Sequence, residues 1–270
     1  MRRCGVLGDP IDHSLSPVLH RAGYAAAGLE WSYTPHRVAE AGLPEFLAGL
    51  DDDWRGLSLT MPLKRTVMGL ATRVTETARL AGGANTLLFA EDGSTTADNT
   101  DVPGAAAALR ERYQGPVTAA TILGGGATAT SLGMALAGLG ATELLILVRS
   151  PERAAATVNA LRALPAPPTV RVGLLGDEPF IGEVVGSTIP ARAQTGALVA
   201  ASREHPVLFE VIYHPWPTPL AAAVAADRTL IGGLDLLVHQ AALQFSWFTG
   251  EPAPLATMRA AGEWALAQRG

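Results

Sequence analysis

The stretch Ile122-Leu123-Gly124-Gly125-Gly126-Ala127-Thr128-Ala129 decides the fold of this chain. Its apolar residues end a predicted strand, its glycines form a turn, and a helix is predicted to begin near Ala127. In that arrangement backbone N–H groups and a helix N-terminus hold a pyrophosphate. Gly124 permits the tight turn, Gly126 lets the backbone approach the phosphates, and Ala129 takes the place of a third glycine where helix and strand meet. The residues predicted to bind a dinucleotide here are Gly124, Gly125, Gly126 and Ala127.

The segment Ile146-Leu147-Val148-Arg149-Ser150 indicates which dinucleotide is bound. A site for NAD places Asp or Glu at the end of this second strand, where the carboxylate binds the free 2′-hydroxyl of the ribose. This chain has Arg149 and Ser150 there, with Arg153 close behind, and guanidinium and hydroxyl donors suit a 2′-phosphate. We therefore predict NADP as the cofactor. The alternative is a glycine turn with a purely structural role, because such turns recur in α/β proteins of every purpose.

Length, charge and composition favour a cytoplasmic enzyme. At 270 residues the chain is long enough for two domains. Its apolar residues are dispersed, and no run approaches the roughly 18 residues of a membrane-spanning helix. The start, Met1 to Pro10, is typical of a strand that ends in a turn rather than of a signal peptide. A net charge of −5 argues against nucleic acid as a partner, and the single cysteine, Cys4, excludes an internal disulfide and a thiolate metal cluster.

Segments typical of strands and helices alternate almost from end to end, which predicts an α/β fold with parallel sheets flanked by helices. The first third is predicted to contain strands at 4–8, 32–38, 56–60 and 86–90, and helices at 17–27 and 62–70. Beyond it we predict strands at 116–123, 143–148, 170–172, 183–187 and 206–212, and helices at 127–139, 151–164, 234–248 and 254–268. A domain boundary near residue 101 follows, because the glycine turn needs a sheet of its own.

Polar residues in the first hundred positions follow the predicted strands where folding alone does not require them. Each cluster has an ordinary alternative: Ser16 can cap a helix, Lys64 can be a solvated surface residue, and Asn or Asp can bond its own backbone in a turn. Together they form a constellation, because ligands of open α/β sheets bind at the carboxyl ends of the strands. The clusters are Ser14 with Ser16, Thr60 with Lys64, Asn85, and Asn99-Thr100-Asp101.

These motifs, with two more downstream, resemble the shikimate dehydrogenase family. The downstream motifs are Tyr213-x-Pro215-x-x-Thr218-Pro219-Leu220 and Gly233-Leu234-x-Leu236-Leu237-Val238-x-Gln240-Ala241, and the whole set has the order of that family from about residue 4 to 260. The resemblance implies reversible, NADPH-dependent reduction of 3-dehydroshikimate to shikimate in aromatic amino-acid biosynthesis. It also implies a split substrate-binding domain, residues 1–101 with 234–270, and a Rossmann-type NADP-binding domain, residues 102–233.

The resemblance assigns a role to each matching residue. Ser14 and Ser16 would hold the substrate carboxylate, and Lys64 with Asp101 would form the catalytic pair. The physics agrees, because hydride reduction of a ketone leaves an alkoxide that needs a proton donor beside it, and a neighbouring carboxylate can hold a lysine there. Thr60, Asn85, Tyr213 and Gln240 complete the predicted substrate site. The predicted cofactor site contains Gly124, Gly125, Gly126, Ala127, Arg149, Ser150, Arg153, Thr188, Gly233 and Leu236.

No metal is expected, because the six histidines show no HxxH or HxxxH pairing. Several positions depart from the family pattern without touching the predicted proton-transfer pair. Ser58 stands where asparagine is usual, Val148 where asparagine often precedes the arginine, and Glu210 where aspartate is common. Residues 187–190 and Asp235-Leu236 also differ near the expected nicotinamide pocket.

Two other functions are compatible with these motifs. A quinate dehydrogenase, or an enzyme of dual specificity, would share nearly all of them and differ in its preferred acid and cofactor. A non-catalytic protein that senses the same small molecules would keep the fold, but binding alone does not need both Lys64 and Asp101. The small-molecule acid is the expected partner, and both a monomer and a homodimer are compatible with the sequence.

Overall fold

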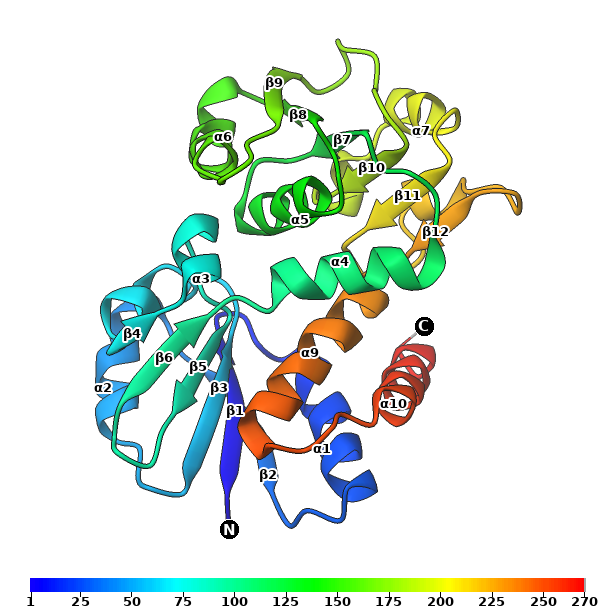
Figure 1. The fold of residues 1–270 in the computed structure, drawn as a ribbon. Coiled ribbons are helices and arrows are strands. Elements are labelled where there is room, and N and C mark those ends of the chain that lie inside the picture. The colour runs from blue at the N-terminus through cyan, green and yellow to red at the C-terminus, as the bar shows by residue number, and fades with distance from the viewer. Residues whose placement is uncertain (270) are drawn as a thin grey trace. The chain divides into compact units, whose positions relative to one another are not determined.

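A computed structural model describes residues 1–269, which divide into two compact units (Figure 1). The first unit contains Met1–Thr100 together with the chain from Leu237 onward, and the second contains Asp101–Leu236. The first break thus falls beside the expected position near residue 101. The second falls inside helix α9 (Gly233–Thr249), three residues beyond the expected one.

The first unit is built on a mixed sheet with the strand order β2-β1-β3-β5-β6-β4. Its strands are β1 (Arg3–Gly8), β2 (Ser32–Arg37), β3 (Trp54–Leu59), β4 (Arg73–Val74), β5 (Thr86–Phe89) and β6 (Thr95–Asp98). The expectation of a wholly parallel sheet is wrong here, because β5 is antiparallel to both β3 and β6. The loop from β5 to β6 closes with the amide of Ala90 donating to Ser94, and so short a loop can join only antiparallel strands.

Helices cover both faces of this sheet (Figure 1). They are α1 (Ser16–Ala26), η1 (Glu40–Gly42), α2 (Leu43–Ala48), η2 (Thr66–Gly69), α3 (Glu76–Ala81), α9 and α10 (Leu255–Ala267). The helix predicted at 62–70 is wrong, because this segment is a run of turns followed by the short 3-10 helix η2. The carbonyl of Lys64, which an α-helix would need, instead accepts the amide of Ala84 at 2.7 Å.

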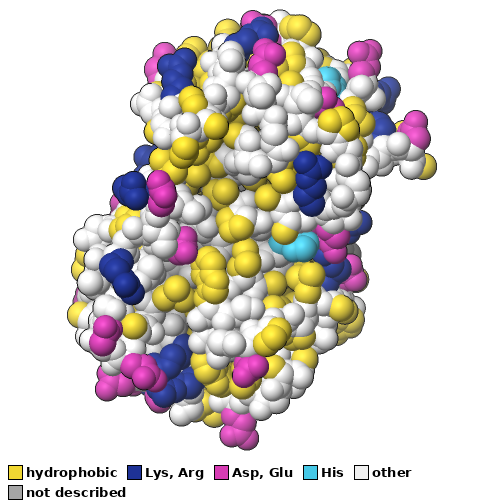
Figure 2. Space-filling view, viewed as in Figure 1, with side chains coloured by type: hydrophobic (Ala, Val, Ile, Leu, Met, Phe, Trp, Pro, Cys, Tyr) yellow, Lys and Arg dark blue, Asp and Glu magenta, His cyan; other side chains and the backbone are white. Residues whose placement is uncertain are grey.

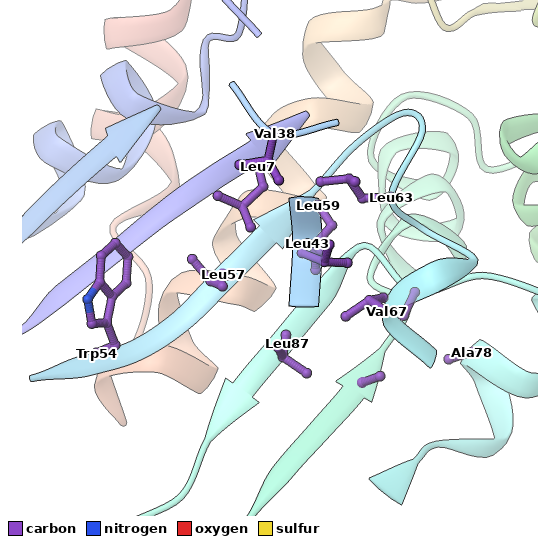
Figure 3. Close-up of a cluster of buried hydrophobic side chains, with 12 residues drawn as sticks. Leu7, Val38, Leu43, Trp54, Leu57, Leu59, Leu63, Val67, Ala78 and Leu87 are labelled. Atoms are coloured by element: carbon purple, nitrogen blue, oxygen red, sulfur yellow. The ribbon is translucent and has the colours of Figure 1, made fainter. Parts of the chain in front are cut away.

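Two cores hold the first unit together. On one face Leu7, Leu57 and Leu87 project from neighbouring strands toward Leu43 of α2 and Val67 of η2 (Figure 3). On the other face α9 crosses β3 so closely that a Cβ atom added to Gly56 would lie 2.1 Å from the ring of Phe248. A glycine at this position in β3 therefore lets the helix lie against the sheet.

The second unit is built on a parallel sheet with the strand order β12-β11-β10-β7-β8-β9, as the sequence predicts for a Rossmann-type domain. Its strands are β7 (Ala119–Leu123), β8 (Glu143–Val148), β9 (Thr169–Leu174), β10 (Val184–Ser187), β11 (Val207–Glu210) and β12 (Thr229–Ile231). Its helices are α4 (Asp101–Arg112), α5 (Ala127–Gly138), η3 (Pro151–Ala154), α6 (Ala155–Arg162), η4 (Ala191–Ala193), α7 (Gly196–Ser202), α8 (Pro219–Ala222) and the first turn of α9.

Alternate residues along the strands of the second unit face opposite sides of its sheet. Ile122 points toward α5 and α6, where it lies near Leu161, whereas the next residue, Leu123, joins the core under α7 and α8. Helices therefore bury both faces, which explains why the strands are almost continuously apolar.

The visible surface carries charged side chains of both signs, scattered singly or in small groups rather than gathered into one basic patch (Figure 2). Across residues 1–269, no helix combines the length and the apolar character needed to cross a membrane.

Candidate active site

The polar clusters of the first unit lie at one edge of its sheet. Strands β1 and β3 run parallel and end at that edge. Because β5 is antiparallel, it begins there, and the residue before it, Asn85, accepts the amide of Leu59 at 2.7 Å. The residues that the sequence predicts for substrate binding in this unit therefore follow or precede strand ends that share an edge: Ser14, Ser16, Thr60, Lys64 and Asn85.

The two serines lie in the turn that leads into α1. Helix α1 begins at Ser16, its N-cap is Leu15, and no side chain caps it, so the N-cap alternative for Ser16 is wrong. Instead the amide of Ser16 donates to the hydroxyl of Ser14 at 3.3 Å. Ser14 is half-buried and Ser16 is buried. The hydroxyl of Ser14 thus accepts one amide at the start of the helix, and Ser16 is the first residue of the helix rather than its N-cap. Hydroxyls beside the free N–H groups of a helix can bind a carboxylate.

Lys64 is held by the turns that surround it. Its carbonyl accepts the amide of Ala84, and Asn99 donates from its side chain to the carbonyl of Gly83 at 2.8 Å. A Cβ on Gly83 would stand 3.4 Å from the Cβ of Lys64, so these turns pack closely. Lys64 is half-buried, unlike the solvated lysine of the alternative interpretation.

Asn85 and Gln240 meet in a buried cluster of amides. The side-chain nitrogen of Asn85 donates to Gln240 Oε1 at 3.2 Å and to the hydroxyl of Thr100 at 2.8 Å. The amide of Thr100 in turn donates to Asn85 Oδ1 at 2.8 Å. The sequence analysis includes Thr100 in the cluster Asn99-Thr100-Asp101 but assigns it no role. The fully buried threonine orients the amide of Asn85 and links it to α9.

Ser58 belongs to a second buried chain of hydrogen bonds behind these amides. Tyr33 donates to the hydroxyl of Ser58 at 2.6 Å, and Ser58 donates to Gln244 Oε1, also at 2.6 Å. Gln244 then donates to the carbonyl of Asn85 at 3.0 Å and to Thr86 at 2.8 Å. The departure from asparagine at position 58 thus occurs in a network that supports Asn85. Sequence reasoning assigned no role to Tyr33, Thr86 and Gln244. Nothing in the sequence distinguishes a polar side chain that is buried in such a network from the other polar residues of a strand or helix.

Asp101 is the first residue of α4 and is 8 % exposed. It follows Thr100 directly in the chain, but it belongs to the second unit, whereas Lys64 belongs to the first. The pairing of Lys64 with Asp101 therefore stays a prediction.

The glycine loop of the second unit lines a cleft of about 390 Å³ together with Arg149, Arg153 and Thr188. Gly124 has a φ of +110°, and a Cβ there would lie 2.2 Å from the hydroxyl oxygen of Thr188, so this turn requires glycine. Helix α5 begins at Ala127, where the sequence predicts it. Ala127 and Ser150 are adjacent in the chain to lining residues but are not among them. Sequence reasoning missed the lining residues Leu175, Arg192 and Ala193, of which Arg192 is the only charged one.

The remaining predicted residues follow β11 and β12, whose carboxyl ends lie at the same edge of the parallel sheet as the glycine loop. Tyr213 comes shortly after β11, and Gly233 and Leu236 lie in the first turn of α9. A Cβ on Gly233 would meet the carbonyl oxygen of Val211 at 2.3 Å, so a larger residue cannot replace it without movement. Asp235, one of the departures, is buried and accepts a hydrogen bond from Arg112 at 2.7 Å.

Glu210, another departure, is a buried carboxylate at the end of β11. It accepts hydrogen bonds from Gln194 at 2.7 Å, from Thr218 at 2.9 Å and from the amide of Ile212 at 3.1 Å. Burial raises the pKa of this carboxyl even though these donors lower it. The glutamate at position 210, which is longer than the aspartate common there, therefore has a structural role. It links β11 by hydrogen bonds to the loop before α7. Within residues 1–269, no three His, Cys, Asp or Glu side chains gather in a way that could hold a metal ion.

A parallel sheet with a glycine loop after one strand and arginines after its neighbour defines a Rossmann-type nucleotide-binding unit. Comparison with known proteins names the family. Residues 6–87 match the shikimate dehydrogenase substrate binding domain, and residues 233–261 match the shikimate 5′-dehydrogenase C-terminal domain. The NADP(+)-dependent shikimate dehydrogenase of Caulobacter vibrioides is 35 % identical, over 94 % of this chain and 92 % of that protein. The chain belongs to the shikimate dehydrogenase family.

Solved structures agree with this membership. The shikimate dehydrogenase of Mycobacterium tuberculosis is 39 % identical, with a TM-score of 0.87 over 98 % of this chain and 100 % of that one. A shikimate 5-dehydrogenase of Thermus thermophilus, solved in complex with NADP(H) and shikimate, is 27 % identical with a TM-score of 0.86, again over 98 % and 100 %. The family and the two-part α/β architecture predicted from the sequence are therefore confirmed.

Proposed function

We propose that this protein catalyses the reversible reduction of 3-dehydroshikimate to shikimate with NADPH. The observation that carries the proposal is the shared sheet edge of the first unit, which gathers hydroxyl, amide and ammonium groups suited to a small hydroxylated acid. Family membership over nearly the whole chain supports the same substrate and cofactor. The overall change is ketone plus NADPH plus a proton to alcohol plus NADP⁺, so the cofactor supplies the hydride and the protein must supply the proton.

Lys64 is proposed as the proton donor. As the ketone carbon gains hydride, its oxygen gains negative charge, which a lysine ammonium stabilises and then neutralises by protonation. Lys64 is the only lysine in the chain, and every other strong side-chain cation is arginine. Because arginine does not give up its proton in proteins, a lysine at this one position favours proton transfer over simple charge pairing. Asp101 is proposed to hold the ammonium in place.

The substrate carboxylate is proposed to bind Ser14 and Ser16 at the start of α1. Thr60, Asn85 and Gln240 are proposed to bind the ring hydroxyls and the carbonyl. The hydrogen bonds that link Asn85 to Thr100 and Gln240 leave its amide in one orientation, as a site must to bind one pattern of hydroxyls.

On the cofactor side, the glycine loop is proposed to bind the pyrophosphate. Arg149, Ser150 and Arg153 are proposed to bind the 2′-phosphate, and Tyr213, Thr188, Gly233 and Leu236 to lie toward the nicotinamide and the substrate. We further propose that the protein works in the cytoplasm as a monomer or homodimer and has no nucleic-acid partner. The net charge of −5 supports the last point.

A spectroscopic assay tests this function. The purified full-length protein is mixed with shikimate and NADP⁺, and the growth of the reduced-nicotinamide absorbance band is followed. We expect saturable reduction of NADP⁺. A rise in melting temperature with shikimate but without turnover would instead identify the non-catalytic sensor.

Assays with quinate distinguish a shikimate dehydrogenase from an enzyme of dual specificity. A quinate dehydrogenase of Corynebacterium glutamicum and a 5-ketofructose reductase share this fold at 24 % and 23 % identity, so the fold does not select the substrate. Quinate adds a hydroxyl on the carboxylate-bearing carbon, which would lie against Ser14 and Ser16. Desolvating that hydroxyl without a partner costs about 1–3 kcal/mol, so we expect at least about a tenfold preference for shikimate in kcat/KM. Comparable efficiencies with the two acids would overturn this preference.

A further inference from the structure

The nucleotide cleft of the second unit contains a cation that the proposed function does not use. Arg192 lies in η4 and lines the same cleft as the glycine loop, Arg149 and Arg153. No carboxylate is among the residues that line this cleft. On a chain with a net charge of −5, three arginines around one small cleft provide the local field that a multiply charged anion needs.

The strand order separates the three arginines into two groups. Strand β7 lies between β8 and β10, and all three strands run parallel. Arg149 and Arg153 follow β8, Arg192 follows β10, and the glycine loop follows β7 in the middle. A pyrophosphate held by the glycine loop therefore has Arg149 on one side and Arg192 on the other. The β8 side is where the ribose 2′-position is recognised, so Arg192 lies toward the opposite, nicotinamide half of the cofactor.

The backbone that carries Arg192 is anchored at both ends. Before it, Thr188 donates to the carbonyl of Leu123 from its amide at 2.9 Å and from its hydroxyl at 2.8 Å, which fixes the loop against β7. After it, the buried side chain of Gln194 donates to Glu210 and accepts the amide of Leu220 at 3.0 Å. Arg192 itself is exposed. A long, exposed cation on a fixed backbone can reach a ligand without reorganising the fold.

We propose that Arg192 binds the pyrophosphate of the cofactor on its nicotinamide side and thereby raises affinity for NADP and NAD alike. The glycine loop offers N–H donors but no net charge, and a guanidinium adds a charge-assisted hydrogen bond to a phosphate oxygen. Arg149 and Arg153, by contrast, distinguish NADP from NAD. This division of roles rests on the proposed function, in which the glycine loop binds the pyrophosphate.

Three probes separate the two roles: NADP⁺, NAD⁺ and adenosine 2′,5′-bisphosphate, which keeps the 2′-phosphate but lacks the nicotinamide half. Their dissociation constants are measured by calorimetry on the full-length protein. Arg192→Gln should weaken NADP⁺ and NAD⁺ by a similar factor, about tenfold or more, and leave the bisphosphate nearly unchanged. Arg149→Gln should weaken NADP⁺ and the bisphosphate and leave NAD⁺ nearly unchanged. Arg192→Lys should recover part of the affinity, because it keeps a charge without the planar fork.

The control is Arg203→Gln, which removes the same charge from an exposed position at the end of α7, outside the residues that line the cleft. It should change none of the three affinities, and all variants should melt at the same temperature without ligand. If Arg192→Gln weakened NADP⁺ but not NAD⁺, Arg192 would be a ligand of the 2′-phosphate, and the proposal would be overturned. Unchanged affinities for both dinucleotides would also overturn it. Failure of the unmodified protein to bind either dinucleotide would refute the proposed function itself.

Discussion

The carbonyl of Lys64 accepts a hydrogen bond from the amide of Ala84, which fixes the backbone of Lys64 at the edge of the sheet. We expect Lys64→Ala to lower kcat by about a hundredfold or more, the usual effect of losing a general acid, with little change in NADP⁺ affinity. Asp101→Asn should act in the same direction. The double variant should lose less than the product of the two single effects, because residues that act as a unit are not additive. Steady-state kinetics and calorimetric NADP⁺ binding check these expectations.

Lys64→Arg is the matched control for this experiment. It keeps a positive charge at the same position but cannot donate a proton near neutral pH. If Lys64 transfers a proton, Lys64→Arg should be almost as slow as Lys64→Ala. Recovery of most of the activity by arginine would show that charge alone is required, and near-normal turnover in Lys64→Ala would remove Lys64 from the mechanism.

The close crossing of α9 over β3 allows us to predict how a larger side chain at position 56 changes stability. A Cβ at position 56 would overlap the Phe248 ring at 2.1 Å, so Gly56→Ala must displace the helix or the ring. Such overpacking of a core costs about 1–3 kcal/mol, measured as the free energy of unfolding in urea. Gly69→Ala is the control, because nothing lies within 4 Å of its added Cβ, and it should be neutral or slightly stabilising. Equal stability of the two variants would contradict this account of the packing.

Several of the strands that sequence reasoning located have a strong apolar pattern, although β2, with the sequence Ser-Tyr-Thr-Pro-His-Arg, does not. Strands β7 and β8 are buried on both faces, so their runs of Val, Ile and Leu were visible without the structure. Strand β6 has the sequence Thr-Thr-Ala-Asp, whose apolar signal is weak, and it was missed. The segment after Thr60 has proline and apolar residues typical of a helix start, but tertiary hydrogen bonds to the neighbouring turn decide its form.

The candidate site was predictable to a different extent from the fold. The sequence does indicate which side chains gather at one edge of a sheet, because glycine turns and strand ends can be located in it, and the roles of these side chains stay predictions. Supporting residues such as Gln244 and Tyr33 were not found, because they act through buried hydrogen bonds between segments far apart in the sequence. Nor does local sequence reveal that Arg192 shares a cleft with Arg149, since only the strand order β10-β7-β8 brings the two loops together.

We expect His20 to make the stability of the first unit depend on pH. It is fully buried in the first unit, where its ring stacks on Tyr33 at 4.2 Å, and burial lowers its pKa to about 3. An unfolded histidine titrates near 6.5, so between these values the unfolded chain binds more protons than the folded one. Stability must therefore rise with pH in this window. It should fall by about 1.4 kcal/mol for each pH unit of acidification below 6.5.

Urea unfolding at pH 7 and pH 5 measures this effect, provided that the signal reports on the first unit alone. Of the five tryptophans only Trp216 lies in the second unit, so fluorescence in a Trp216→Phe background follows the first. In that background the free energy of unfolding should fall between pH 7 and pH 5. We expect this fall to be about 2 kcal/mol smaller in His20→Gln than in the protein that keeps His20. His13→Gln, which removes an exposed histidine, is the matched control. If His20→Gln left this fall unchanged, the carboxyl groups alone would account for the acid sensitivity of the unit.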